Sequence, residues 1–147
     1  MAAGLRVSLG QYSDAGTKSI NQDAHGARLP ESSERHAKGV ALALADGISS
    51  SEVAHIASAT AVTSFLADYF CTSAAWSVKK SGYRVIDATN SWLHGQTDSS
   101  WARYDKDRGY VCTFTALIIK STTAHLFHLG DSRAYRIREG VLEQLTE

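Results

Sequence analysis

The stretch GVALALADG, residues 39–47, decides the fold, because an unbroken run of small apolar residues ends at an acid and a glycine. A run of this length and composition predicts a β-strand that is buried on both faces. A carboxylate at the end of such a strand is costly unless a metal ion or the N-terminus of the next helix compensates it. Gly47 allows a sharp turn that brings a carbonyl oxygen near the same cation. Taken alone, Asp46-Gly47 is more simply explained as a turn into a helix.

The segments on either side of this strand show two different periods. Val53, Ile56, Ala57, Thr60 and Phe65 recur at helical spacing, after a Ser49/Glu52 pair with the spacing of a capping box. We therefore expect a helix from about Glu52 to Phe70, and a second from Trp76 to about Tyr104, although Gly82 and Gly95 disfavour the latter. Strands are expected at residues 5–12, 24–29, 113–120, 123–129 and 134–138, with a last hairpin into 141–142 and a loop at 30–38.

Strands that are grouped apart from helices indicate an α+β fold with an antiparallel sheet rather than alternating βαβ units. The chain has 147 residues, which is enough for one domain with a buried core. The last group of strands is expected to form an antiparallel meander.

Charge and composition exclude several classes of function. The chain has 15 basic and 15 acidic residues, so no overall field favours nucleic acid or an anionic membrane. No signal peptide and no run of about 18 apolar residues is present, which favours a cytoplasmic protein without membrane contact. Cys71 and Cys112 match no zinc or redox spacing and are expected to be reduced core thiols.

Three acids stand at predicted strand ends beside turn residues, namely Asp23, Asp46 and Asp131. Each alone is more simply a solvated or turn residue, and Asp131 has the alternative of pairing with Arg133. As a set they are more informative, because Mg²⁺ and Mn²⁺ prefer oxygen ligands, and no His/Cys cluster offers a zinc site. A divalent metal site built from separated acids is therefore the chemical hypothesis.

Four blocks in a fixed order carry a family resemblance. They are GTKSINQD at 16–23, ADG at 45–47, CTFT at 112–115 and GDSRAY at 130–135. This order is similar to the PPM family of metal-dependent, type-2C-like serine/threonine phosphatases, in its bacterial form. The resemblance implies a β-sandwich flanked by antiparallel helices, of which residues 1–147 would be an incomplete, N-terminal part of one phosphatase domain that continues beyond residue 147.

The resemblance also implies roles for individual residues. Asp46 would bridge two Mn²⁺ or Mg²⁺ ions, and the Gly47 carbonyl would ligate one of them. Asp23 would bind a metal directly or through its water, and Asp131 would help to hold a further, looser metal. Lys18 stands where the family usually has an arginine that grips the substrate phosphate. The implied reaction is hydrolysis of phosphoserine or phosphothreonine in proteins by a water whose pKa both metals lower, so neither cysteine is a nucleophile.

The chain departs from the family pattern in ways that weaken the implied activity. Lys18 lacks the bidentate fork of arginine, and Gln22 replaces an acid of some relatives. After Asp46-Gly47 the family often has two further glycines and a histidine, and this chain has Ile48-Ser-Ser-Ser51 in their place. The family's later aspartates are absent, so metal affinity and turnover of this chain alone should be poor or nil.

Two further readings follow from the same residues. A catalytically inactive domain of the same fold, acting as a regulatory or binding module, is the alternative function. The sequence from Asp46 through the second helix resembles bacterial chains in which such a phosphatase precedes a protein kinase. This resemblance implies a partner, namely a kinase domain in the same full-length chain.

Overall fold

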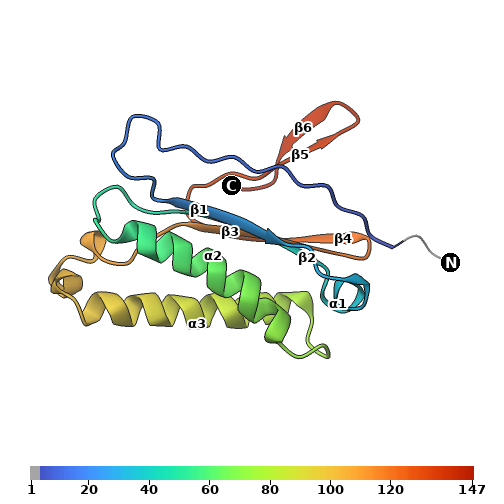
Figure 1. The fold of residues 1–147 in the computed structure, drawn as a ribbon, viewed down its shortest axis with the longest axis horizontal. Helices are drawn as coiled ribbons and strands as arrows, with labels where there is room; N and C mark the ends of the chain where they lie inside the picture. Colours follow the sequence, from blue (N-terminus) through green and yellow to red (C-terminus); the bar gives the residue numbers. More distant parts are fainter. Residues whose placement is uncertain (1–3) are drawn as a thin grey trace.

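The computed structural model describes residues 4–147 and places a four-stranded antiparallel sheet on a layer of helices (Figure 1). The sheet has the spatial order β1-β2-β3-β4, so each strand pairs with its neighbour in the sequence. Its strands are β1 (Asp23–Arg28), β2 (Val40–Asp46), β3 (Phe114–Lys120) and β4 (Thr123–Leu129). The helices are α1 (Ser32–Lys38), α2 (Ala54–Cys71) and α3 (Val78–Asp98). The α+β class and the antiparallel sheet are confirmed.

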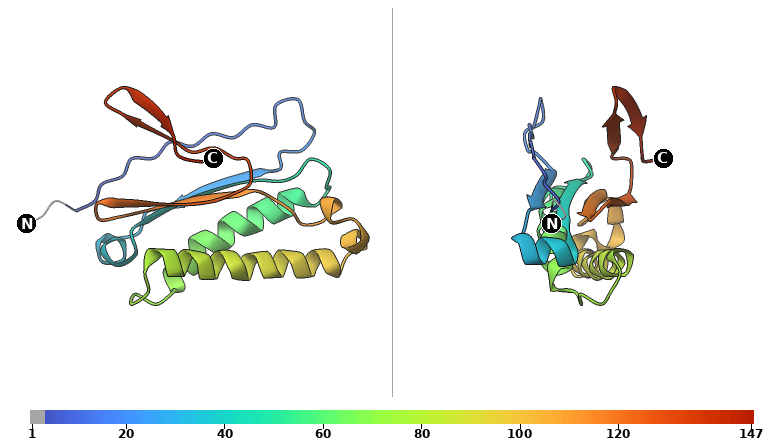
Figure 2. Two further views of the ribbon diagram at one scale, coloured as in Figure 1. Left: turned by 180° about the vertical axis from the view of Figure 1, so that it is seen from behind. Right: turned by 90° about the vertical axis from the view of Figure 1, so that its right-hand side faces the viewer.

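The two long helices run antiparallel to each other and cover only one face of the sheet (Figures 1 and 2). Ala41, Ala43 and Ala45 of β2 lie on this face and are at most 5% exposed, and their small side chains allow α2 to approach closely. Leu44 points to the other face and is 45% exposed. The prediction that this strand is buried on both faces is therefore wrong at its C-terminal half, because within residues 4–147 no second layer covers Leu44.

Aromatic side chains fill the space between helices and sheet. The Phe65 ring of α2 lies 5.3 Å from that of Phe114 and 6.1 Å from that of Phe127, measured between centroids. Gly82 of α3 meets the same cluster, since a Cβ added there would lie 2.2 Å from the Phe127 ring. The glycine that disfavours helix by propensity is thus required by packing.

The ends of the helices differ from their predicted ends. No side chain caps α2 through the expected Ser49/Glu52 box; instead Val53 is the N-cap residue, and its N–H donates to Ser51 Oγ at 3.2 Å. Helix α3 ends at Asp98, and the chain continues in two 3-10 turns, Trp101–Tyr104 and Lys106–Arg108, where we had expected the helix to continue to Tyr104.

Two local predictions near the N-terminus are wrong. Residues 5–12 alternate apolar and polar side chains but form no strand, because none of the described residues, 4–147, provides a partner strand beside them. The polar stretch 30–38, expected as a loop, contains α1. The Arg35 guanidinium donates to the Pro30 carbonyl at 2.8 Å and helps to hold this short helix against the chain that enters it.

The predicted meander divides into two parts. Strands β3 and β4 join the main sheet, whereas β5 (Tyr135–Arg138) and β6 (Val141–Gln144) form a separate two-stranded sheet that projects from it (Figure 1). Within residues 4–147, no helix is both long and apolar enough to span a bilayer.

Candidate metal centre

The register of β1 and β2 brings two of the predicted acids side by side. Asp23 is the cross-strand partner of Asp46, at the end of the sheet where β1 begins and β2 ends. Ala24 packs on the helix-side core, so the alternation of a strand turns both neighbouring carboxylates to the opposite, helix-free face. Acids that stand 23 positions apart in the sequence therefore share one site.

The charge state of Asp46 reflects its neighbours. Burial raises the pKa of this carboxyl above its ordinary value, and its hydrogen-bonding contact with the Asp23 carboxyl and the negative charges of Asp23 and Asp131 raise it further. The ammonium of Lys18 acts in the opposite direction and lowers it. The three other charged residues that were predicted for the site, Asp23, Asp131 and Lys18, thus all act on the Asp46 carboxyl group.

The backbone at Asp46 is held by Thr113, the residue before β3. The Asp46 N–H donates to Thr113 Oγ1 at 3.1 Å, and the Thr113 N–H donates to the Asp46 carbonyl at 2.8 Å. Thr113 Oγ1 also lies 2.9 Å from Ser132 Oγ, which ties the Gly130-Asp131-Ser132 turn to this strand end. Gly130 adopts a φ of 105° and packs so closely on Thr113 that a Cβ would lie 2.6 Å from its methyl group.

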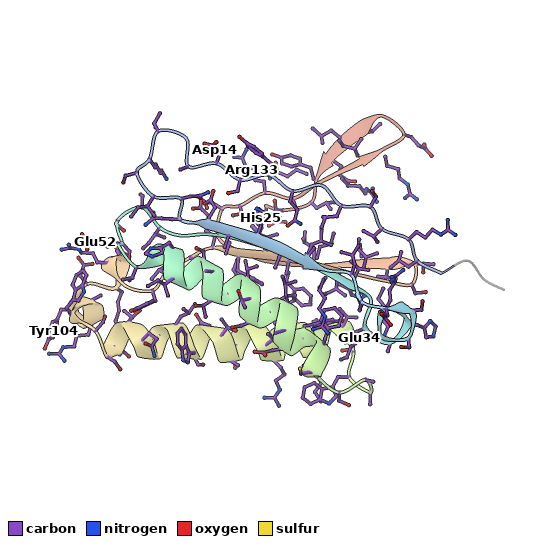
Figure 3. All side chains as sticks on the ribbon, in the orientation of Figure 1. Asp14, His25, Glu34, Glu52, Tyr104 and Arg133 are labelled. Atoms are coloured by element: carbon purple, nitrogen blue, oxygen red, sulfur yellow. The ribbon has the colours of Figure 1, made fainter. Side chains whose placement is uncertain are left out.

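Asp23 and Lys18 are placed by the loop before β1. The Asp23 N–H donates to Asn21 Oδ1 at 3.0 Å, and Asn21 Nδ2 donates to Ser13 Oγ at 2.8 Å. Lys18 follows a tight turn in which its N–H donates to the Ala15 carbonyl at 3.1 Å. His25, two residues further along the same face of β1, has Nδ1 2.8 Å from Gln11 Oε1, so the N-terminal segment crosses this face (Figure 3).

Gly47 allows the chain to leave β2 beneath the first turn of α2. A Cβ at this position would lie 2.8 Å from the Cβ of Ala54, so no larger residue fits without a shift. Gly47 also forms an antiparallel bridge to Cys112. Burial and the charge of Asp46 raise the pKa of the Cys112 thiol to about 11, which keeps it protonated at neutral pH and unsuited to nucleophilic attack.

The donor set fits a divalent cation in part. Asp23 and Asp46 offer neighbouring carboxylate oxygens, the ligands that Mg²⁺ and Mn²⁺ prefer, and neither forms an ion pair within residues 4–147. Asp131 influences Asp46 but makes no ion pair with Arg133 either. The described residues contain no group of three or more His, Cys, Asp or Glu side chains placed to hold a metal ion. Two carboxylates are a partial ligand set.

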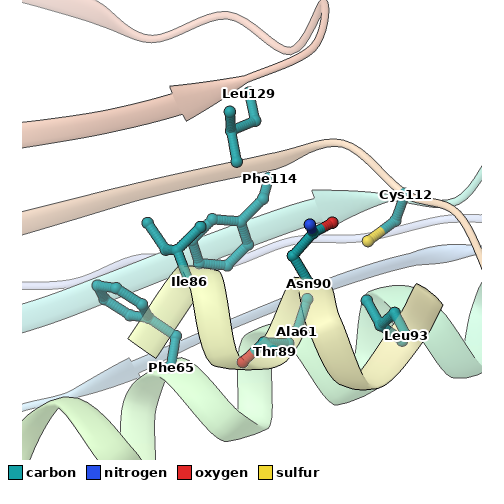
Figure 4. Close-up of a pocket in the computed structure, with 9 residues that line it drawn as sticks. All are labelled: Ala61, Phe65, Ile86, Thr89, Asn90, Leu93, Cys112, Phe114 and Leu129. Atoms are coloured by element: carbon teal, nitrogen blue, oxygen red, sulfur yellow. The ribbon is translucent and has the colours of Figure 1, made fainter. Parts of the chain in front are cut away.

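A separate cavity of about 60 Å³ lies between α2, α3 and β3 (Figure 4). Its walls are mainly apolar, including Phe65, Leu93 and Phe114, and the polar groups of Asn90 and Cys112 border it. This space suits a few water molecules at most and is too small for a phosphorylated side chain with its peptide. The cavity is a feature of core packing.

Several residues that build the site received no role from the sequence. Asn21 has a recognisable signal, since an Asn side chain in a turn commonly accepts a hydrogen bond from the backbone N–H two residues further along, here that of Asp23. The contacts of Thr113 and Ser51 have no such local signal, because their partners lie 67 and 58 positions away, at Asp46 and Gly109, although Thr113 belongs to the CTFT block.

Comparisons with known proteins identify the family and the fold. The family model described as protein phosphatase 2C matches residues 11–147. The serine/threonine phosphatase PstP/Ppp of Mycobacterium tuberculosis is 26% identical with a TM-score of 0.65, and the match covers 89% of this chain and 49% of that one. A further PstP structure, of the catalytic domain with two manganese ions, is 26% identical with a TM-score of 0.65, over 88% and 50% of the two chains.

The serine/threonine phosphatase Stp1 of Staphylococcus aureus shares the fold at 21% identity. Its TM-score is 0.73, and the match covers 98% of this chain and 57% of that one. The chain thus spans about half the length of the solved structures that it matches. No curated protein matches it in sequence.

Proposed function

The chain belongs to the protein phosphatase 2C family, and on that premise we propose that its full-length protein hydrolyses phosphoserine and phosphothreonine in proteins. Asp23, Asp46 and the carbonyl of Gly47 would hold two divalent ions, Mn²⁺ or Mg²⁺, and Asp131 a further, looser one. The observation that carries the proposal is the cross-strand pairing of Asp23 with Asp46. Two unpaired neighbouring carboxylates are stable together when a cation lies between them.

The chemistry divides between the ions and the chain. Bound divalent ions would lower the pKa of a water molecule and offset the charge that develops on the phosphoryl oxygens. Asp46 and Asp23 would orient those ions, and Thr113 would keep the Asp46 backbone in place through its two hydrogen bonds. Lys18 would attract the substrate phosphate as a point charge, and its position near Asp46 supports that role. No covalent phosphoenzyme is needed.

An inactive regulatory or binding module of the same fold is the second candidate. The observation that favours it is that, within residues 4–147, no third His, Cys, Asp or Glu side chain joins the carboxylate pair in a group that could hold a metal ion. The two candidates make different predictions, because a binding module needs Lys18 and the surface around it but no metal-dependent turnover.

We also propose that residues 1–147 form the N-terminal part of one phosphatase domain that continues further along the chain. Support comes from the solved phosphatases, of which this chain covers 49–57% in the three comparisons above. The remaining ligands would then come from that continuation. A phosphoprotein would be the substrate, and a kinase domain in the same full-length chain is the partner that the sequence resemblance suggests.

The test is hydrolysis of p-nitrophenyl phosphate and of a phosphothreonine peptide by the full-length protein, with Mn²⁺ and with EDTA. We expect turnover only with the metal, and a loss of about a hundredfold or more in Asp46→Asn, since the ligand's share of charge stabilisation is several kcal/mol. Activity that persists in EDTA or in Asp46→Asn would rule out the catalytic assignment. Phosphopeptide binding without any turnover would favour the inactive module.

A further inference from the structure

Ser51 is a buried serine in the connection between β2 and α2, and its polar atoms are fully used. It is 2% exposed, and its hydroxyl donates to the Gly109 carbonyl at 2.7 Å and lies 3.0 Å from the Arg108 carbonyl. The same Oγ accepts from the Val53 N–H at 3.2 Å. The segment that follows Asp46-Gly47 is therefore hydrogen-bonded, through Ser51, to the loop after α3.

Gln22 connects this fastened segment to β1. Its Nε2 donates to the Ser51 carbonyl at 2.6 Å, and its own carbonyl accepts from the Gly47 N–H at 3.0 Å. The Ser58 hydroxyl of α2 donates to the same Gln22 carbonyl. Gln22 immediately precedes Asp23, and Gly47 immediately follows Asp46, so these bonds join the two strand ends directly beside the two carboxylates.

We infer that Gln22 and Ser51 are positioning residues that hold Asp23 and Asp46 at the separation needed to bind a divalent cation. The inference rests on the proposed function. Like charges on directly opposed strand positions repel each other, and the end of a β-ladder is the place where strands separate most easily. The side-chain amide of Gln22 and the hydroxyl of Ser51 supply links there that the ladder itself lacks.

The position of Ser51 in the sequence supports a positioning role in addition to its role in packing. Residues 48–51 replace the glycine-rich segment expected from the family pattern, and the structure shows that a hydroxyl there fixes the segment to residues 108–109. Residues behind metal ligands typically change metal affinity 10- to 100-fold when they are altered. Gln22 and Ser51 would act through the carboxylates and would touch neither substrate nor metal.

The experiment measures Mn²⁺ binding calorimetrically in the full-length protein for Gln22→Met and Ser51→Ala. Each change removes a hydrogen-bonding group with little change in size. We expect Mn²⁺ to bind about tenfold more weakly or worse in both variants, and the Mn²⁺ concentration for half-maximal phosphatase activity to rise by the same factor.

Two matched controls separate positioning from general loss of stability. Gln144→Met removes an amide that donates to the Thr146 carbonyl at 2.8 Å, and Ser81→Ala removes a fully buried hydroxyl near Lys38. Neither lies in the network of Gln22, so Mn²⁺ affinity should stay within about twofold of the parent in both, whatever their unfolding temperature.

The outcomes distinguish this inference from the proposed function. If Asp46→Asn abolishes Mn²⁺ binding while Gln22→Met binds as tightly as Gln144→Met, the positioning role is overturned and the function stands. If Asp46→Asn leaves Mn²⁺ binding unchanged, the proposed function itself fails. Should Ser51→Ala not fold, Gln22→Met decides the matter alone, because its side chain is only half-buried.

Discussion

At the scale of the residue, Asp46 combines partial burial with a like-charged neighbour on the opposed strand position. Both effects raise its pKa above its value in the unfolded chain. The folded state then binds more protons than the unfolded state between those two pKa values. The contribution of Asp46 to stability is therefore full below the unfolded pKa, near 4, and is lost as the pH rises through the folded one.

The first prediction is that Asp46→Asn stabilises the metal-free chain at neutral pH but not at pH 3.5. Asparagine keeps the shape of a protonated aspartate, so the gain should be roughly 0.5–1 kcal/mol at pH 7, of the order of one cross-strand charge repulsion. Urea denaturation in EDTA across this pH range measures it. In the full-length protein with Mn²⁺ present the order should reverse, because only the parent gains binding energy from the metal. A variant that is less stable than the parent at pH 7 in EDTA would contradict the argument.

Lys18 carries the second prediction at this scale. Lys18→Ala should raise KM for a phosphopeptide about 10- to 100-fold in the full-length protein, which corresponds to the loss of one charge-assisted hydrogen bond. Lys18→Arg should restore or improve KM, because the guanidinium grips two phosphate oxygens at once. Steady-state kinetics checks both. Equal KM values for the alanine variant and the parent would remove Lys18 from the substrate site.

At the scale of the element, helix α3 contains two glycines in very different surroundings. A Cβ at Gly82 would lie 2.2 Å from the Phe127 ring, whereas a Cβ at Gly95 would meet nothing within 4 Å. Helix propensity favours alanine over glycine at both positions by about 1 kcal/mol. Packing opposes it at Gly82 alone.

The third prediction follows from that contrast. Gly82→Ala should destabilise the chain by about 1–3 kcal/mol, the usual cost of overpacking a core, while Gly95→Ala should stabilise it by up to about 1 kcal/mol. Chemical denaturation of the two variants, which differ only in position along one helix, makes the comparison. Similar effects of the two changes would show that α3 does not press on β4 through Gly82.

The same elements show how much of the fold was predictable from sequence. Helix α2 and strands β3 and β4 follow strong local periods, so they lie within one or two residues of their predicted places. Residues 5–12 alternate equally well, yet alternation without a partner strand gives no ladder. Helix α1 lies in the polar stretch 30–38, for which composition alone predicts a loop.

The candidate site was predictable to a different degree. Motif order pointed to Asp23, Asp46, Gly47, Asp131 and Lys18, and the structure brings both carboxylates together with charges that act on Asp46. The β1–β2 register and the contacts of Thr113 and Ser51 depend on long-range pairing. No local pattern reveals them.

At the scale of the whole molecule, the sheet is packed on one face only. The helices cover one side, and the other carries a groove of about 290 Å³ between the N-terminal segment and the projecting hairpin. Leu42, Leu44 and Leu117 line its floor, and Leu9 and Leu145 its sides. Apolar side chains gathered in this way are usually covered in the working protein.

The proposal that the domain continues along the chain makes a fourth prediction here. Leu44→Thr should cost about 1 kcal/mol or less in residues 1–147 alone, since Leu44 is 45% exposed and threonine suits a strand. In the full-length protein the same change should cost roughly 2–3 kcal/mol, because a continuation that covers this face would bury the leucine. Ile118→Val, on the helix side and fully buried, is the matched control and should cost about 1 kcal/mol in both. Denaturant titrations of residues 1–147 and of the full-length protein give the comparison. An equal cost of Leu44→Thr in both would mean that the rest of the protein leaves this face uncovered. The missing metal ligands of the carboxylate pair would then have to come from elsewhere.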